Sequence, residues 1–310
     1  MALTRLFLLL AVLAFGCGGE GEGDLSEKAA SVAAEEPATG DTIIRGSIGD
    51  ASNLIPALAT DSSSFDIINQ VYSGLVRYDR NLEVEGNLAE RWEISDDGLE
   101  ITFFLRRGVI WHDGAPFTAA DVLFTYRLMI DPGTPTAYGE DFLQVSSLDV
   151  VDPHTVRVRY ERPFAPALIS WSFPMMPKHL LEGEDVTTSG LGRHPVGTGP
   201  YRFGSWLTGE KIVLEANEDY WEGRPYIDRY VYRIIPDTAT MFLELRSGNL
   251  DWMNLDPLQY ARQTDSEFFS ENYRKHRYLD FRYTYLGFNL NDPKFKDKRV
   301  RQAIAHAIDK

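Results

Sequence analysis

The chain has 310 residues, of which 44% are hydrophobic and 12% aromatic, enough to build large cores in about two globular domains. A formal net charge of −15 argues against a nucleic-acid-binding protein and against adsorption to anionic lipid, because both need a basic surface. The single cysteine excludes a disulfide bond within the chain.

The N-terminal residues predict export from the cytoplasm. Arg5 precedes an apolar run over residues 6–15, which is shorter than a comfortable membrane span and is typical of a signal peptide. We expect the signal peptide to cover residues 1–16.

The end of this signal, LAFGC, resembles that of a lipoprotein, in which cleavage precedes a cysteine that receives a diacylglyceryl group. Small Gly16 before Cys17 fits the pattern, whereas Ala14 stands where leucine is usual. The alternative is an ordinary signal cleaved nearby. We expect lipidation at Cys17, then a flexible tether over residues 17–40 that is rich in Gly, Glu, Ala and Ser. The protein would then lie outside the cytoplasm, in the periplasm or at the cell surface.

Folding is expected to begin near Thr42, where TIIRGSI predicts a buried strand. A helix is predicted beyond the next extended piece, because apolar residues recur there at helical spacing and the serines at positions 62–64 offer an N-cap. The apolar residues of this helix are Phe65, Ile68, Val71, Tyr72 and Leu75.

Two regions of β-hairpins are predicted, one over residues 75–105 and one over LDVVDPHTVRVRYERP. In the first, Asp96, Asp97 and Gly98 form a turn before LEITFFL, whose apolar residues alternate. Neighbouring aspartates in such a turn point apart into water. We therefore interpret them as turn residues and not as an acid/base pair.

The stretch VIWHDGAPFTAADVLFTYRLMIDP joins His112 and Asp113 to a predicted helix. The Asp-Gly pair is a turn, Pro116 ends the strand before it, and Thr118 with Asp121 predicts a capped helix start. The histidine lacks the further ligands that zinc requires and the nucleophile that a catalytic triad requires. We interpret the pair as a structural corner.

The motif HPVGTGPYRF contains two closely spaced glycines, so a phosphate-binding loop is one alternative. Pro200 removes an N–H donor and no Lys-Ser/Thr pair follows, so a tight turn is predicted instead. The rest of the chain predicts strands at residues 209–217, 228–236 and 278–290, a helix ending at Gly248, and an amphipathic helix over residues 295–310.

Enzyme and metal signatures are missing from the sequence. HExxH, GxSxG and CxxC do not occur, and the six histidines never adopt metal-ligand spacing. We accordingly predict no enzymatic activity, no catalytic residues, no metal site and no cofactor.

Five sequence pieces follow one another in a recognisable order between residues 42 and 310. They are NLAERWEISDDGLEITFFLRRGVIWHDGAPFTAADVLFTY, VGTGPYRF, ANEDYWEGRPYIDRYVYRIIPD, LRSGNLDW and LGFNLNDPKFKDKRVRQAIAHAIDK. Together they resemble the extracellular solute-binding proteins of family 5, the oligopeptide, dipeptide and nickel class that serves ABC importers.

This resemblance implies a mixed α/β, bilobal fold of the periplasmic-binding-protein type II kind, of which the chain holds the N-terminal part and lacks the C-terminal lobe. The implied domain I, the core lobe, comprises residues 41–74 and 178–277. An inserted α+β domain II would comprise residues 75–177, and residues 278–310 would start a truncated domain III.

The function implied by the resemblance is that of the substrate-binding component of an ABC-type importer. Such a component captures peptides or related small solutes outside the cytoplasmic membrane and delivers them to a permease with its ATPase subunits. We expect a monomer, held at the membrane through an N-terminal lipid anchor. Two alternatives stay open: a secreted, lipid-anchored hydrolase that uses some of the 46 acidic residues, and a peptide sensor that does not transport.

The resemblance also implies ligand-binding residues. Thr60, Asp61 and Ser62 match the family's cleft-edge strand, and Tyr138 matches a position where relatives often place a ligand-contacting tyrosine. Asn254 and Tyr285 fall where the chain crosses into the cleft. The alternatives are that residues 61–64 only cap the helix, that the first tyrosine lies in an exposed loop, and that the second belongs to a core.

Overall fold

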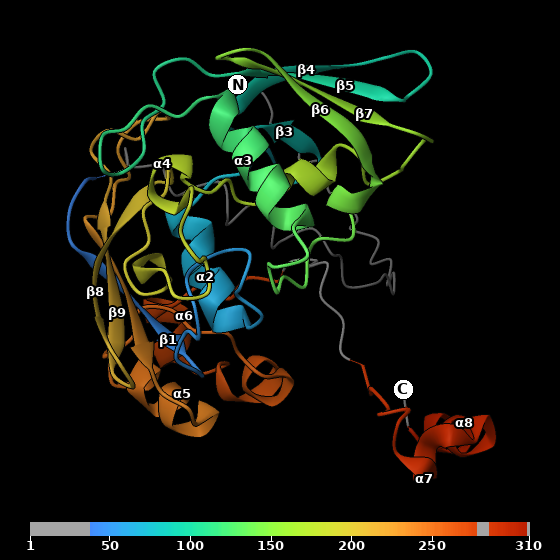
Figure 1. The fold of residues 1–310 in the computed structure, drawn as a ribbon. Helices are drawn as coiled ribbons and strands as arrows, with labels where there is room; N and C mark the ends of the chain where they lie inside the picture. The colour runs from blue at the N-terminus through green and yellow to red at the C-terminus, as the bar shows by residue number, and fades with distance from the viewer. Residues whose placement is uncertain (1–37, 278–284, 309–310) are drawn as a thin grey trace, which may run out of the picture. The chain divides into compact units, whose positions relative to one another are not determined.

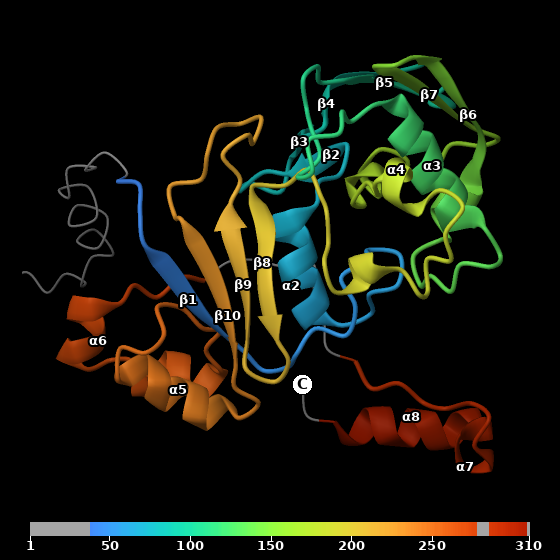
Figure 2. The ribbon, with the colours of Figure 1, turned by 60° about the vertical axis from the view of Figure 1, so that its left-hand side comes forward.

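The computed structural model describes residues 38–277 and 285–308, drawn as coloured ribbon in Figures 1 and 2. The predicted signal peptide, Cys17 and the tether up to residue 37 lie outside the described residues. The described chain divides into two compact units, one ending at Asn254 and one starting at Leu255. Strands and helices alternate in the first unit, so the expected mixed α/β class is confirmed.

The first unit contains a four-stranded sheet with the order β1-β10-β9-β8. Its strands are β1 (Thr42–Ser47), β8 (Tyr201–Leu207), β9 (Lys211–Ala216) and β10 (Arg229–Ile234). β1 runs parallel to β10, whereas the other pairs are antiparallel. The predicted strands at residues 42–48, 209–217 and 228–236 are therefore confirmed.

Two helices flank this sheet. Helix α2 (Ser62–Val71) packs against β8 on one face, as Figure 2 shows, and the Tyr232 hydroxyl donates to the Asp66 carbonyl at 2.9 Å. Helix α5 (Thr238–Arg246) also lies against the sheet, where the Met241 sulfur occupies the space that a Cβ on Gly46 would need. In β9, Ile212 and Leu214 alternate with more exposed residues and are buried.

A second four-stranded sheet, fully antiparallel, has the order β4-β5-β7-β6. Its strands are β4 (Ala89–Ile94), β5 (Glu100–Leu105), β6 (Val145–Asp152) and β7 (Thr155–Tyr160). A short pair, β2 (Val76–Tyr78) and β3 (Val84–Gly86), precedes it. Both predicted hairpin regions are confirmed, and Ile101, Phe103 and Leu105 are buried as their alternation predicts.

Helix α3 (Ala119–Ile130) packs against β6 and β7 and starts where the sequence predicts. The Thr118 side chain accepts from the Ala120 amide, and the Asp121 carboxylate accepts from the Thr118 amide at 2.9 Å. This capping box satisfies N–H groups that the first turn leaves unpaired. The cap of α2 differs from the prediction, because Asp61 and not a serine occupies the N-cap position and accepts from the Ser64 amide at 2.8 Å.

The predicted corner at His112 is present, but its construction differs from the prediction. No strand covers residues 109–111, where only an isolated bridge joins Ile110 to Pro116. The imidazole instead holds the GTG segment: Nδ1 accepts from the Gly197 amide at 3.2 Å, and Nε2–H donates to the Gly199 carbonyl at 3.0 Å. Burial, the largest influence, lowers the pKa of His112 to about 4, consistent with a neutral imidazole in this role.

Both glycines of the GTG segment are needed for close backbone approach. A Cβ on Gly197 would lie 1.9 Å from the Val71 carbonyl oxygen at the end of α2, and one on Gly199 would lie 2.5 Å from the Gln70 oxygen. The predicted turn is present as a bend, and its glycines serve packing against the helix.

Short helices complete the first unit, and further helices form the second unit. Those of the first are η1 (Phe142–Gln144), η2 (Ile169–Ser172), α4 (Lys178–Leu181) and η3 (Gly190–Gly192). Those of the second are η4 (Gln259–Gln263), α6 (Glu267–Asn272), α7 (Pro293–Lys296) and α8 (Lys298–Ala307). The C-terminal helix prediction is thus confirmed in α8.

The strand predicted over residues 278–290 is wrong where it can be checked. Residues 278–284 lie outside the described part of the chain, and residues 285–290 form no strand.

Among the helices that the structure describes, none combines the length and apolar character that crossing a bilayer requires.

Candidate functional site

The segment leading into α2 is extended and leaves backbone groups unused. Asp61 has φ −114° and ψ 154°, and Thr60 and Ser62 on either side of it are exposed. Among the described residues, no backbone hydrogen bond reaches the N–H or C=O of Thr60 or the N–H of Asp61. Such unpaired groups in an extended segment are what an added peptide strand needs.

The Asp61 carboxylate is held by a network of hydroxyl groups. Oδ2 accepts from the Ser52 hydroxyl at 2.5 Å and from the Ser64 hydroxyl at 2.7 Å, while Oδ1 accepts from the Ser64 amide. Partial burial opposes ionisation, but these hydrogen bonds outweigh it and lower the pKa of Asp61. The residue therefore caps the helix, as one alternative proposed, and keeps a fixed negative charge beside the extended segment.

Tyr138 reaches the same end of α2 from the loop after α3. Its ring meets Phe65 edge-on at 5.3 Å between centroids and packs against Phe173 at 5.9 Å, yet 36% of the residue stays exposed. Burial and the nearby Asp61 charge raise the pKa of Tyr138, so the phenol stays protonated and can donate a hydrogen bond. The structure thus brings this tyrosine to the segment of residues 60–62.

A hollow of about 360 Å³ opens beside this tyrosine. Its walls are mostly apolar, with two carboxylates at the edge: the lining residues are Ala137, Tyr138, Glu140, Asp141, Phe142, Ile169, Ser170, Ser172 and Phe173. Apolar walls with a few polar groups are typical of a pocket that accepts a ligand side chain.

The other two predicted site residues do not join this group through any contact of the described residues. Asn254 is exposed and ends the segment that pairs with β1, since the Gly46 amide donates to the Trp252 carbonyl at 3.1 Å. Tyr285 belongs to the second unit and is 76% exposed, so the expectation that it is a core residue is not met.

Sequence reasoning missed two aromatic residues of the site. Phe65 looked like a core residue of the helix face, but it is only partly buried and supports the Tyr138 ring. Phe173 gave no signal because its contact to the same ring joins segments 35 residues apart in the chain. Which aromatic residues contact the Tyr138 ring depends on tertiary packing, and a local sequence pattern does not predict it.

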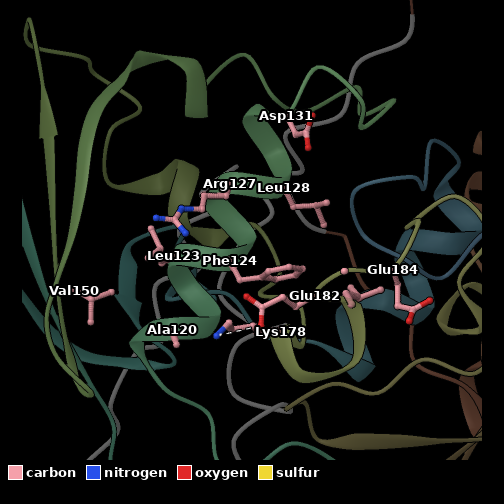
Figure 3. A pocket seen from close by; sticks show the side chains of 12 residues that line it. Ala120, Leu123, Phe124, Arg127, Leu128, Asp131, Val150, Lys178, Glu182 and Glu184 are labelled. Atoms are coloured by element: carbon pink, nitrogen blue, oxygen red, sulfur yellow. Dashed lines mark ion pairs between the residues drawn. The ribbon is translucent and has the colours of Figure 1, made fainter.

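Another hollow, with a volume of about 500 Å³, is lined mainly by α3, α4 and residues 182–184 (Figure 3). Phe124 occupies its middle, and Lys178 pairs with Glu182 at 3.4 Å on one side. It contains none of the predicted site residues. We therefore place the candidate site at residues 60–62 and Tyr138, because chemistry and geometry agree there, and not at the larger hollow.

Three comparisons with known proteins bear on this geometry. The family model described as bacterial extracellular solute-binding proteins, family 5 Middle, matches residues 83–310. The oligopeptide-binding protein AppA of Bacillus subtilis is 32% identical over 318 residues, covering 100% of this chain and 57% of the relative. The chain therefore spans little more than half the length of this relative.

Two solved structures are similar over the same part of the chain. AppA from Bacillus subtilis in complex with a nonapeptide has a TM-score of 0.81 and 33% identity, covering 88% of this chain and 55% of that one. NikZ from Campylobacter jejuni in complex with Ni(L-His) has a TM-score of 0.74 and 31% identity, covering 87% and 53%. The chain belongs to the bacterial extracellular solute-binding proteins of family 5.

Proposed function

We propose that the chain forms part of the substrate-binding component of an ABC-type importer that captures peptides outside the cytoplasmic membrane. The observation that carries this proposal is the extended segment at Thr60 and Asp61, whose N–H groups pair with no described backbone group and which lies beside the partly exposed Tyr138. The relative solved with a nonapeptide shares the fold of this part.

Capture would use strand addition. A peptide laid along residues 60–62 would pair its main chain with the free N–H and C=O groups, which gives affinity without selecting side chains. The Tyr138 phenol would donate to a ligand carbonyl, and the hollow beside it would accept one ligand side chain. A dissociation constant near 1 μM, about −8 kcal/mol, would suffice for capture before transport.

Asn254 and Tyr285 are proposed as further ligand contacts in the whole protein. The first has an exposed side chain on the segment beside β1, which is what a ligand contact requires, and the second exposes most of its ring. Closure of two lobes over the peptide would bring contacts from both sides of the cleft together.

The domain boundaries given by the family resemblance are part of the proposal. They receive support from the sheets, because β1 and β8 to β10 fall within residues 41–74 and 178–277, whereas β2 to β7 fall within residues 75–177. Residues 278–310 would start the third domain. The proposed partners are a membrane permease with its ATPase subunits and, through Cys17, the membrane itself.

Native mass spectrometry of the full-length protein tests the proposal. We expect the protein purified without unfolding to carry peptides of mixed sequence, and the same protein refolded from urea to be empty and to rebind a pool of randomised nonapeptides. One defined small molecule in place of peptides would contradict strand addition. Cleavage of the added peptides into products would contradict the role of a binding protein and support the hydrolase alternative.

A further inference from the structure

Arg45 is an unusual residue for the middle of an apolar strand. It lies in β1 and is only 8% exposed, although arginine is almost never buried without partners. Ile44 and Gly46, its neighbours in the strand, offer no charged partner. The partners of the guanidinium must therefore come from other elements.

The guanidinium has partners on two different elements. Its Nη2 forms an ion pair with Asp66 Oδ2 of helix α2 at 2.7 Å, and the two side chains are 10% and 21% exposed. Its carbon lies 3.9 Å from the centre of the Trp252 ring and 5.6 Å from that of Tyr232. Arginine differs from lysine in its planar fork of N–H donors and in its ability to stack on aromatic rings. Here the guanidinium pairs with a carboxylate and lies over an aromatic face, so it uses both properties.

The chain around Trp252 is also paired with β1 through its backbone. The Trp252 amide donates to the Ile44 carbonyl at 3.2 Å, and the Gly46 amide donates back to the Trp252 carbonyl at 3.1 Å. The Ile44 amide in turn donates to the Asp251 carboxylate at 2.7 Å. Residues 251–252 thus cover the edge of β1 as one further parallel bridge, with Arg45 opposite the tryptophan.

These contacts join two of the three segments that carry proposed ligand residues in the first unit. Asp66 lies one turn into α2, whose N-cap is Asp61, and Trp252 precedes Asn254 by two residues. We propose that Arg45 is a positioning residue that fixes the start of α2 and the segment of Asn254 relative to each other, so that both meet the ligand in a ready-made geometry. This proposal rests on the proposed function.

A purely structural role makes a different prediction. If the ion pair only stabilised the fold, replacing the arginine would lower the unfolding temperature but leave the affinity of the folded molecules unchanged. A positioning role requires that affinity falls in molecules that are fully folded, and that the backbone bridge at residues 251–252 opens more often.

The test uses the full-length protein and three variants. Arg45→Met keeps the length of the side chain and removes the charge, Arg45→Lys keeps the charge without the planar fork, and Asp66→Asn removes the partner charge. The matched control is Arg193→Met, because Arg193 lies 3.4 Å from the centre of the Trp206 ring and is exposed, away from the bridge. Binding of a dansylated pool of randomised nonapeptides is followed by anisotropy, and amide exchange by mass spectrometry.

We expect Arg45→Met to weaken binding about tenfold and to speed exchange of the Trp252 amide about tenfold, at temperatures where the protein stays folded. Arg45→Lys should recover about half of the loss on a logarithmic scale, and Arg193→Met should stay within about twofold of the wild type. Should Arg45→Met fail to fold, Arg45→Lys and Asp66→Asn decide by the same readouts.

Two results would overturn the proposal. One is unchanged affinity in folded Arg45→Met or, if it does not fold, in Asp66→Asn; the other is wild-type exchange at the Trp252 amide in the same variant. If the wild-type protein binds no peptide from the pool, the proposed function fails, but the exchange measurement still decides whether Arg45 holds the bridge.

Discussion

Two places where loops meet helix α2 are built in opposite ways. At its C-terminal end, His112 and the GTG segment form hydrogen bonds with each other. The His112 amide donates to the Gly197 carbonyl at 2.8 Å, and the imidazole forms hydrogen bonds with the backbone of Gly197 and Gly199. At its N-terminal end, the backbone of Thr60 pairs with no other backbone group in the described part of the chain, and Tyr138 keeps about a third of its surface exposed.

This difference distinguishes the structural end of the helix from the proposed binding site. A corner that only holds the fold gains stability by pairing every buried donor and acceptor, because each unpaired one costs about 1–3 kcal/mol. A site that accepts the backbone of a ligand must leave hydrogen-bond donors and acceptors unpaired, and these groups stay exposed to water until the ligand binds. The histidine, which looked chemically interesting in the sequence, is therefore structural, whereas the plain Thr-Asp-Ser segment has the free groups.

The largest expected effect on stability comes from a substitution at the C-terminal end of α2. Gly197→Ala places a Cβ 1.9 Å from the Val71 carbonyl oxygen, a backbone atom that cannot rotate away. We expect a loss of about 4 kcal/mol in the free energy of unfolding, measured by urea denaturation. The control is Gly190→Ala, since a Cβ there meets nothing within 4 Å. A Gly197→Ala protein with the wild-type urea midpoint would show that the contact is not as tight as described.

A smaller effect comes from protonating His112. Folding lowers the pKa of His112 from its ordinary value of 6.5 to about 4, so between these pH values the unfolded chain binds a proton that the folded chain does not. The free energy of unfolding therefore falls as the pH drops below 6.5, by up to about 3 kcal/mol near pH 4.

The His112→Gln variant isolates this contribution. It lacks the titrating group, so the stability difference between wild type and variant should shrink as the pH is lowered from 7 to 4.5, whereas exposed His194→Gln should follow the wild type at every pH. A constant difference between wild type and His112→Gln would mean that the imidazole is not held neutral.

The sequence predicted those parts of the architecture that depend on local signals. Caps and turns act within a few residues, so the start of α3 at Thr118 and the DDG turn were correctly assigned. The register of hairpins follows from alternation, as at Ile101 and Phe103, because burial of one face selects it. The family resemblance supplied the candidate residues, and in the structure Tyr138 packs on Phe65 at the end of α2 that Asp61 caps.

Local sequence patterns could not predict contacts between segments that are far apart in the chain. The partners of His112 lie 85 and 87 residues away, and Arg45 meets Trp252 across more than two hundred residues. No local pattern marks such contacts, since they depend on how whole elements pack. The strand predicted over residues 278–290 is not formed at residues 285–290, where none of the described strands pairs with the chain.

A moderate effect is expected at the N-cap of α2. Asp61→Ala removes the acceptor of hydrogen bonds from Ser52 and Ser64 and should cost about 1–2 kcal/mol in thermal or urea unfolding. Asp61→Asn keeps a capping oxygen and should cost less. Folding lowers the pKa of the Asp61 carboxyl below its ordinary value of 3.8. The advantage of aspartate over asparagine is therefore present above pH 3.8 and is lost as the pH falls further.

The exposed turn residue Asp96 provides the matched control for this cap. Asp96→Ala changes the same side chain at a position without a helix start and should alter stability by less than about 0.5 kcal/mol. Equal losses in Asp61→Ala and Asp96→Ala would show that the hydroxyl network contributes nothing specific.

The smallest effect on stability, and the most informative for function, is expected at Tyr138. Because the ring is 36% exposed, Tyr138→Ala should cost less than about 1 kcal/mol in the free energy of unfolding, yet it should weaken binding of randomised nonapeptides to the full-length protein about fivefold. Tyr138→Phe keeps the packing on Phe65 and Phe173 and should lose only the hydroxyl contribution. Tyr226→Ala, at another exposed tyrosine, should leave binding unchanged. If Tyr138→Ala lost stability but kept full affinity, this end of α2 would be architecture like the other, and the distinction drawn between them would fail.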